Sequence, residues 1–115
     1  MIYTSYFAKA KYIENDKKLV SIARFSPKGL TIASAPELMP TKEILLKYKQ
    51  DGNEEEYIEA YHRDVLSKLS PSKIAIKYRN KVLLCYERPE AFCHRHLIAQ
   101  WLKDHGFKCE ELHMN

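Results

Sequence analysis

Two patterns of apolar residues alternate along the chain. Short runs rich in β-branched and aromatic residues predict strands at 2–6 and 19–24. The segment "KVLLCYE", residues 81–87, is apolar with little alternation, which is typical of a strand buried on both faces in a parallel sheet. A last strand is expected within "FKCEELH". The link between the first two strands is polar and short, so we expect an irregular segment or a single helical turn there.

Apolar residues at helical spacing fill the rest of the chain, apart from a proline-rich stretch at 25–40 that is the longest loop candidate. Thr41 is placed to cap one helix, which ends at "DG", and Asn53 is placed to cap the next. Ser70-Pro71 is a strong signal for a third helix start. The segment "FCHRHLIAQWLKDHG" predicts a fourth helix. The run Glu54–Glu56 fits a first helical turn better than a metal site.

Strands separated by helices predict a single α/β domain over residues 1–115, with three layers and a small, mostly parallel sheet. Composition agrees, since 45% of residues are hydrophobic and 30% are charged. No apolar run approaches the roughly 20 residues of a membrane span, and the first residues do not resemble a secretory signal. We therefore expect a soluble, cytoplasmic protein without membrane partners. Three cysteines without regular spacing are expected to be free thiols.

The formal net charge of +4 is uneven along the chain. Residues 41–70 carry five Lys/Arg against seven Asp/Glu, whereas residues 1–40 carry six against three and residues 71–115 carry eight against five. Basic flanks attract phosphates. A mildly basic solvated surface explains the same numbers, and we favour it over a nucleic-acid face.

Reactive side chains gather in "LLCYERPEAFCHRHLIAQWL", residues 83–102. Cys85 and Glu87 lie at the end of the predicted buried strand, and Cys93, His94 and Arg95 lie at the start of the next helix. Ligands of parallel sheets bind outside the carboxyl ends of the strands, and a helix N-terminus favours an anion. The same surroundings make Cys93 a candidate thiolate. We therefore predict a functional site here.

The ends of the other strands are expected at the same rim of the sheet. Ser5 and Tyr6 end the first strand, and Arg24 ends the second. In a parallel sheet, Arg24 and Arg95 are predicted to flank one anion, because guanidinium groups suit carboxylate and phosphate.

Helical spacing separates the two histidines of the cluster. His94 shares a face with Ile98, Trp101 and Leu102, which are expected in the core, whereas His96 aligns with exposed positions. We therefore prefer His94 as a site residue and expect His96 to face solvent.

The cluster closely resembles the signature of the domain of unknown function 488 family. Cys85 and Glu87 match its Leu-Cys-x-Glu element, and Cys93, His94 and Arg95 match its Cys-His-Arg helix start. The segments "IYTSYFAKAK" and "LVSIARFSPKG" resemble the short members of the family, and Arg24 stands at the position of a characteristic arginine after the second strand. The resemblance implies an α/β fold and a pocket at these residues; it names no reaction and no cofactor.

Three functions remain open. The first is an enzyme acting on a phosphate- or carboxylate-bearing small molecule such as a nucleotide. In it Cys93 would be the nucleophile, His94 the proton carrier and Glu87 the base or orienting group, with Cys85 beside them. Arg24, Arg95, Ser5 and Tyr6 would bind the anion. The second is a nucleotide- or nucleic-acid-binding module without chemistry. The third, a metal site of Cys85, Cys93 and the two histidines, matches no familiar zinc spacing, so we expect no metal.

Overall fold

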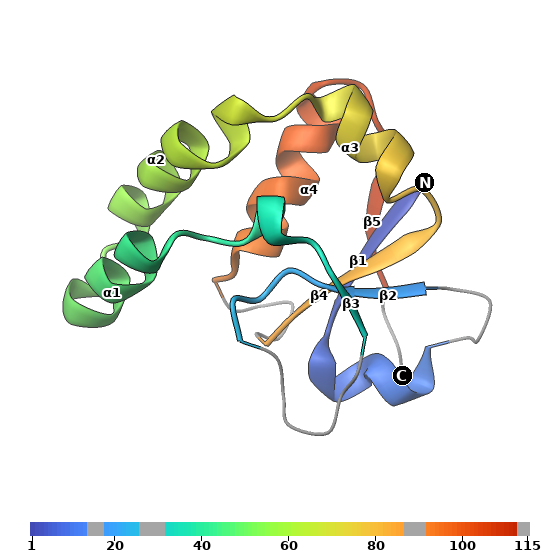
Figure 1. Cartoon of the computed structure of the whole chain (residues 1–115), viewed down its shortest axis with the longest axis horizontal. Helices are drawn as coiled ribbons and strands as arrows, with labels where there is room; N and C mark the ends of the chain where they lie inside the picture. The colour runs from blue at the N-terminus through green and yellow to red at the C-terminus, as the bar shows by residue number, and fades with distance from the viewer. Residues whose placement is uncertain (14–17, 26–31, 87–91, 113–115) are drawn as a thin grey trace.

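The computed structural model describes residues 1–13, 18–25, 32–86 and 92–112. Within them, five strands form one sheet in the order β3-β2-β4-β1-β5, and every neighbouring pair is parallel (Figure 1). The strands are β1 (Ile2–Tyr6), β2 (Lys18–Ser21), β3 (Ala33–Ser34), β4 (Lys81–Cys85) and β5 (Cys109–Glu111). A parallel sheet with intervening helices confirms the predicted α/β class.

Helices occupy most of the chain between β3 and β5. Among the described residues they are α1 (Lys42–Asp51), α2 (Glu54–Asp64), α3 (Pro71–Lys77) and α4 (His94–Asp104), with the short 3-10 helices η2 (Pro36–Leu38) and η3 (Leu66–Lys68). Another 3-10 helix, η1 (Phe7–Tyr12), lies between β1 and β2. The three expected caps are confirmed. The side chains of Thr41, Asn53 and Ser70 each accept a hydrogen bond from the backbone N–H three residues later, at 3.2, 3.1 and 3.4 Å. No described helix has the length and apolar character that crossing a membrane would require.

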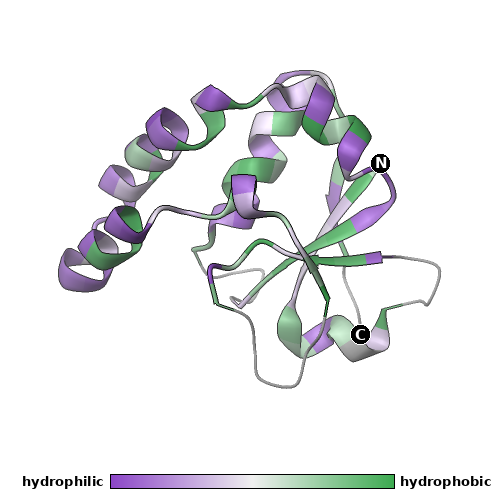
Figure 2. Cartoon of the chain, in the orientation of Figure 1, coloured by the Kyte–Doolittle hydropathy of each residue, from purple (hydrophilic) through white to green (hydrophobic). Residues whose placement is uncertain are grey.

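The central strand β4 explains the layering. Leu83 and Cys85 pack into the large cluster formed with the α-helices, whereas Val82 and Leu84 pack into a smaller cluster beside η1. Alternate side chains of a strand point to opposite faces, so an unbroken apolar run is needed when both faces are covered. Figure 2 shows the resulting apolar centre and the polar outer surfaces of α1 and α2.

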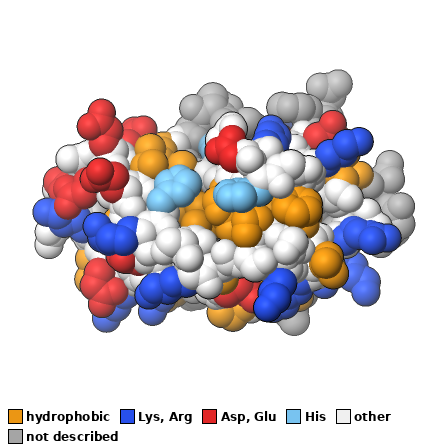
Figure 3. Space-filling view, turned by 90° about the horizontal axis from the view of Figure 1, so that it is seen from above, with side chains coloured by type: hydrophobic (Ala, Val, Ile, Leu, Met, Phe, Trp, Pro, Cys, Tyr) orange, Lys and Arg blue, Asp and Glu red, His pale blue; other side chains and the backbone are white. Residues whose placement is uncertain are grey.

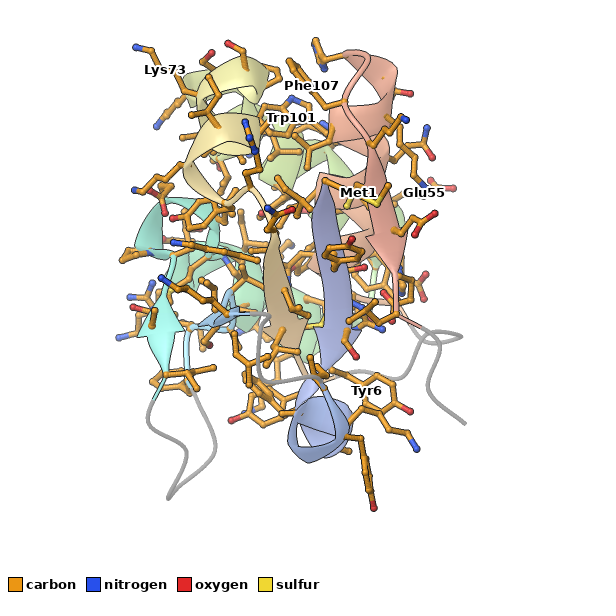
Figure 4. The ribbon with its side chains drawn as sticks, turned by 90° about the vertical axis from the view of Figure 1, so that its right-hand side faces the viewer. Met1, Tyr6, Glu55, Lys73, Trp101 and Phe107 are labelled. Atoms are coloured by element: carbon orange, nitrogen blue, oxygen red, sulfur yellow. A yellow bond between two sulfur atoms is a disulfide. The ribbon has the colours of Figure 1, made fainter. Side chains whose placement is uncertain are left out.

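Strand order places a crevice at the end of β4. The link after β2 leads outward to β3 on one side, and the link after β4, which contains α4, leads to β5 on the far side of β1. The chain therefore diverges between the carboxyl ends of β2 and β4, and parallel sheets bind ligands at such a point. In Figure 4, Met1 and Tyr6 mark the amino and carboxyl ends of β1, and Trp101 and Phe107 lie towards the amino end.

Several predicted boundaries were wrong. The second strand ends at Ser21 instead of residue 24, and the stretch 25–40, expected as a loop, contains β3 and η2. The short link after the first strand, expected to be irregular or a single helical turn, contains the 3-10 helix η1. Within α4, Ile98, Trp101 and Leu102 are buried as expected, but His96 is half-buried and not exposed.

Candidate functional site

A cavity of about 240 Å³ opens where β2 and β4 end, between these strand ends, α1, α2 and the start of α4. Aromatic rings form much of its wall: Tyr48 comes from α1, Tyr57 comes from α2, and Phe92 precedes α4. Their rings contact one another, with centroids 4.9 to 5.4 Å apart. Cys85, Cys93, His94 and Arg24 line the same cavity. The structure therefore places four of the predicted site residues around one aromatic pocket.

Cys85 and Cys93 form a disulfide. Cys85 is the last residue of β4 and Cys93 is the N-cap of α4, and both side chains are buried. The prediction of three free thiols was therefore wrong, because only Cys109 is a free cysteine. A separation of eight residues has no diagnostic value in sequence, but the fold brings the strand end and the helix start together.

His94 is held in one tautomer by the backbone. Its Nε2 lies 2.7 Å from the carbonyl oxygen of Ile22, which can only accept, so Nε2 carries the proton. Its Nδ1 then has a free lone pair, and this atom lies 3.8 Å from Cys93 Sγ. Burial lowers the pKa of His94 to about 4, so the imidazole is neutral near pH 7. The geometry supplies a neutral base beside a sulfur of the pocket.

Arg95 is completely buried and is held by Glu111 of β5. Its Nε and Nη2 donate to the two carboxylate oxygens at 2.9 and 3.0 Å, a bidentate ion pair. Thr4 also donates to this carboxylate, at 2.6 Å. The remaining nitrogen, Nη1, donates to Cys85 Sγ at 2.7 Å. The guanidinium of Arg95 therefore donates a hydrogen bond to the Cys85 sulfur, while Glu111 neutralises the positive charge of Arg95.

The expected clamp of two arginines is not formed. Arg24 is exposed and lines the pocket, whereas Arg95 is not among the lining residues and has its charge paired inside the protein. Tyr6 packs against Arg95, with the guanidinium 5.7 Å from its ring centre. Ser5 is fully buried and alternates with Thr4 and Tyr6, so its side chain faces the η1 side of the sheet. Glu87 lies outside the described residues.

Sequence reasoning missed Glu111 and the aromatic wall. Glu111 sits 16 residues from Arg95, and its role depends on β5 pairing with β1. Tyr48 and Tyr57 fall within the first two segments expected to be helical, where an aromatic residue fits a core as well as a pocket. Among the described residues, no group of three His, Cys, Asp or Glu side chains is arranged to hold a metal ion.

One comparison with known families finds a match over most of the chain. A family model described as the "Active DUF488-N3 subclade" matches residues 4–106, a span that includes β4, α4 and the second half of β1. No curated protein and no solved structure matches the chain. Because the family model covers most of the chain, including the two cysteines, His94 and Arg95, the protein belongs to the DUF488 family.

Proposed function

We propose that the protein is a cytoplasmic thiol enzyme that acts on a small molecule with a planar group and a phosphate or carboxylate. Cys93 is the nucleophile, His94 moves its proton and Arg24 binds the anion. The observation that carries the proposal is the fixed tautomer of His94, whose unprotonated Nδ1 faces Cys93 Sγ inside an aromatic pocket. A neighbouring base with its own orienting partner is the arrangement that activates a thiol for attack.

The disulfide must open before the nucleophile can act. Two molecules of a low-molecular-weight thiol reduce the Cys85–Cys93 bond to two thiols and become joined as a disulfide themselves. A reducing cytoplasm supplies such thiols, which is why we place the activity there. In the reduced state, the hydrogen bond from Arg95 Nη1 stabilises negative charge on Cys85.

In the reaction, the proton of Cys93 moves to His94 Nδ1 while Cys93 Sγ bonds to the electrophilic atom of the substrate. The bond to the leaving group breaks, and the leaving group takes the proton from His94. Because burial lowers the pKa of His94 to about 4, the imidazolium is a good acid toward the leaving group. The same shift makes the neutral imidazole a weak base, so the thiol proton moves only as the bond from Cys93 Sγ to the substrate forms. Water then hydrolyses the covalent Cys93 adduct and restores the thiol.

Alkylation of the reduced protein tests the nucleophile. The variant His94→Gln keeps an N–H for the Ile22 carbonyl but has no basic nitrogen, so it separates the proton acceptor from the structural hydrogen bond. We expect iodoacetamide to modify Cys93 at least about tenfold more slowly in this variant near pH 7, as for the loss of a general base. Mass spectrometry assigns the modified cysteine.

The variant Cys85→Ser is the matched control, because it also removes the disulfide and leaves His94 beside Cys93. Its Cys93 should react as fast as in the reduced wild-type protein. Equal rates in wild-type and His94→Gln proteins would refute the base assignment. Adenosine monophosphate, as a planar anionic probe, should slow the modification of Cys93 in both the wild-type and the Cys85→Ser proteins.

A further inference from the structure

A second hollow lies directly beside the pocket and continues it along α1. The two hollows share Arg24, Phe25, Leu45 and Tyr48. The second has a volume of about 380 Å³, and its remaining walls come from Lys42, Leu46 and Lys49. Because the linings overlap, a ligand seated in the pocket can extend over α1 without leaving the surface of the protein.

The lining of this second hollow is basic. Arg24, Lys42 and Lys49, which we call the basic strip, are exposed, and no acidic residue is part of the lining. None of the three forms a salt bridge within the part of the chain that the structure describes. Elsewhere on α1, Lys47 lies 3.6 and 3.7 Å from the carboxylates of Asp51 and Glu56. The basic strip therefore presents uncompensated positive charge, although the region 41–70 is acidic as a whole.

The face seen in Figure 3 does not share this segregation. Figure 3 looks down on the top of the molecule as drawn in Figure 1 and shows acidic and basic side chains interspersed around an apolar centre. Mixed charges of this kind suit a solvated surface. A stretch with cations alone favours a polyanion.

Exposed apolar side chains surround the same opening. Phe25 is 73% exposed, Leu46 is 51% exposed and Tyr86 is 49% exposed. Phe25 lines both hollows, Leu46 lines the outer one and Tyr86 lines the inner one. Exposed aromatic rings next to cations are the means by which single-stranded nucleic acids are held, since rings stack on bases and cations follow the backbone.

Size and spacing fit this ligand. The inner cavity, about 240 Å³, is below the range of about 300–1,000 Å³ typical of pockets that enclose drug-sized ligands, so it suits a base and leaves the phosphates outside. Lys42 and Lys49 are two helical turns apart, about 10 Å along α1. Three stacked nucleotides rise by a similar length, at about 3.4 Å each.

We propose that the ligand of the pocket is a nucleotide within a single-stranded nucleic acid, whose base enters the aromatic pocket while its backbone lies on the basic strip. This inference rests on the proposed function for the chemistry of the pocket and adds the class of substrate. An anionic membrane fits less well, because it would leave the aromatic wall of the inner cavity unfilled. The α1 helix also has only ten residues and lacks the broad apolar face of an interfacial helix.

Binding of fluorescently labelled single-stranded DNA of about 12 nucleotides, followed by anisotropy, tests the proposal. A parallel measurement with an RNA of the same sequence shows whether the protein prefers DNA or RNA. We expect Lys42→Glu with Lys49→Glu to weaken binding at least about tenfold. The matched control, Lys73→Glu with Lys103→Glu, makes the same change in net charge at exposed lysines outside the basic strip and should weaken binding by less than about threefold.

Salt dependence gives an independent measure. Neutral replacement, Lys42→Gln with Lys49→Gln, should reduce the slope of log affinity against log salt by about 1.4, since each single-strand phosphate contact contributes about 0.7. Phe25→Ala should weaken binding severalfold without changing this slope. An unchanged slope in the Gln variant would overturn the assignment of the backbone to the basic strip.

The remaining outcomes separate this inference from the proposed function. Equal losses in the strip variant and the control would overturn a defined binding site. Vesicles with about 30% phosphatidylserine that bind the protein when DNA and RNA do not would overturn it in favour of a membrane. The Lys42→Glu, Lys49→Glu protein should keep the wild-type rate of Cys93 alkylation. Strip-dependent nucleic-acid binding together with an unreactive Cys93 would leave the nucleic-acid site standing and refute only the thiol enzyme.

Discussion

Replacing Arg95 with methionine removes the guanidinium and leaves an unbranched side chain in the same buried space. The change leaves the carboxylate of Glu111 without its ion-pair partner, while the hydroxyl of Thr4 still donates to it. The side chain of Glu111 is only 14% exposed, so water compensates little of the loss. The variant is therefore expected to be destabilised chiefly by a buried, unpaired charge.

The magnitude follows from the burial of the pair. Removing one partner of a buried ion pair costs about 3–5 kcal/mol, and the hydrogen bond from Thr4 places this case near the lower limit, about 3 kcal/mol. For 115 residues, an unfolding entropy of about 2.1 cal/mol/K per residue converts this loss into a fall in Tm of about 12 °C. The double variant Arg95→Met, Glu111→Met removes both charges and should recover about 1–2 kcal/mol of the loss.

Urea unfolding followed by circular dichroism measures these free energies, with and without a dithiol because the Cys85–Cys93 bond contributes to stability. The order expected is wild type, then the double variant, then Arg95→Met alone. A double variant less stable than Arg95→Met would refute the reasoning, because it would mean that the unpaired carboxylate is not the source of the loss.

Three further measurements follow from the buried groups. Burial lowers the pKa of His94 to about 4 from an unfolded value near 6.5, so the unfolded chain binds a proton at higher pH than the folded protein does. The free energy of unfolding should therefore fall by up to about 3 kcal/mol as the pH drops from about 6.5 to about 4. The variant His94→Gln should lack this pH-dependent loss. Burial raises the pKa of Cys109 to about 11, so iodoacetamide should modify it most slowly in the reduced native protein at about pH 8; labelling as fast as that of Cys93 would contradict its burial. Thiol titration of the unfolded protein should detect only Cys109 before reduction and all three cysteines afterwards, whereas three thiols without reductant would exclude the disulfide.

Local signals explain why the helices could be predicted well. Thr41, Asn53 and Ser70 each satisfy a backbone N–H only three positions away, so the sequence contains both partners of the interaction. The strand β3 was missed because it has two residues, both exposed, and exists only through pairing with β2. A short edge strand carries no periodic pattern that a single sequence could reveal.

The same difference between local and distant partners explains which parts of the candidate site could be predicted. The position of Cys85, Cys93 and His94 followed from a strand that ends where a helix begins, which is again local. The orientation of Arg95 did not follow, since it depends on β5 returning beside β1 and placing Glu111 within reach. An arginine at a helix start predicts an anion site only when no carboxylate of the protein itself comes close.

That internal carboxylate decides how the pocket must recognise a charged ligand. Because Glu111 neutralises Arg95, the floor of the pocket offers a ligand no unpaired positive charge from α4, and His94 is neutral near pH 7. An anionic group is therefore expected to be bound at the mouth, by Arg24 and the two lysines of the basic strip. In the proposed function, the buried residues carry the chemistry, whereas the exposed residues select the ligand. Substitutions of Lys42 and Lys49 should consequently change which molecules bind without changing the reactivity of Cys93, which lines only the inner cavity.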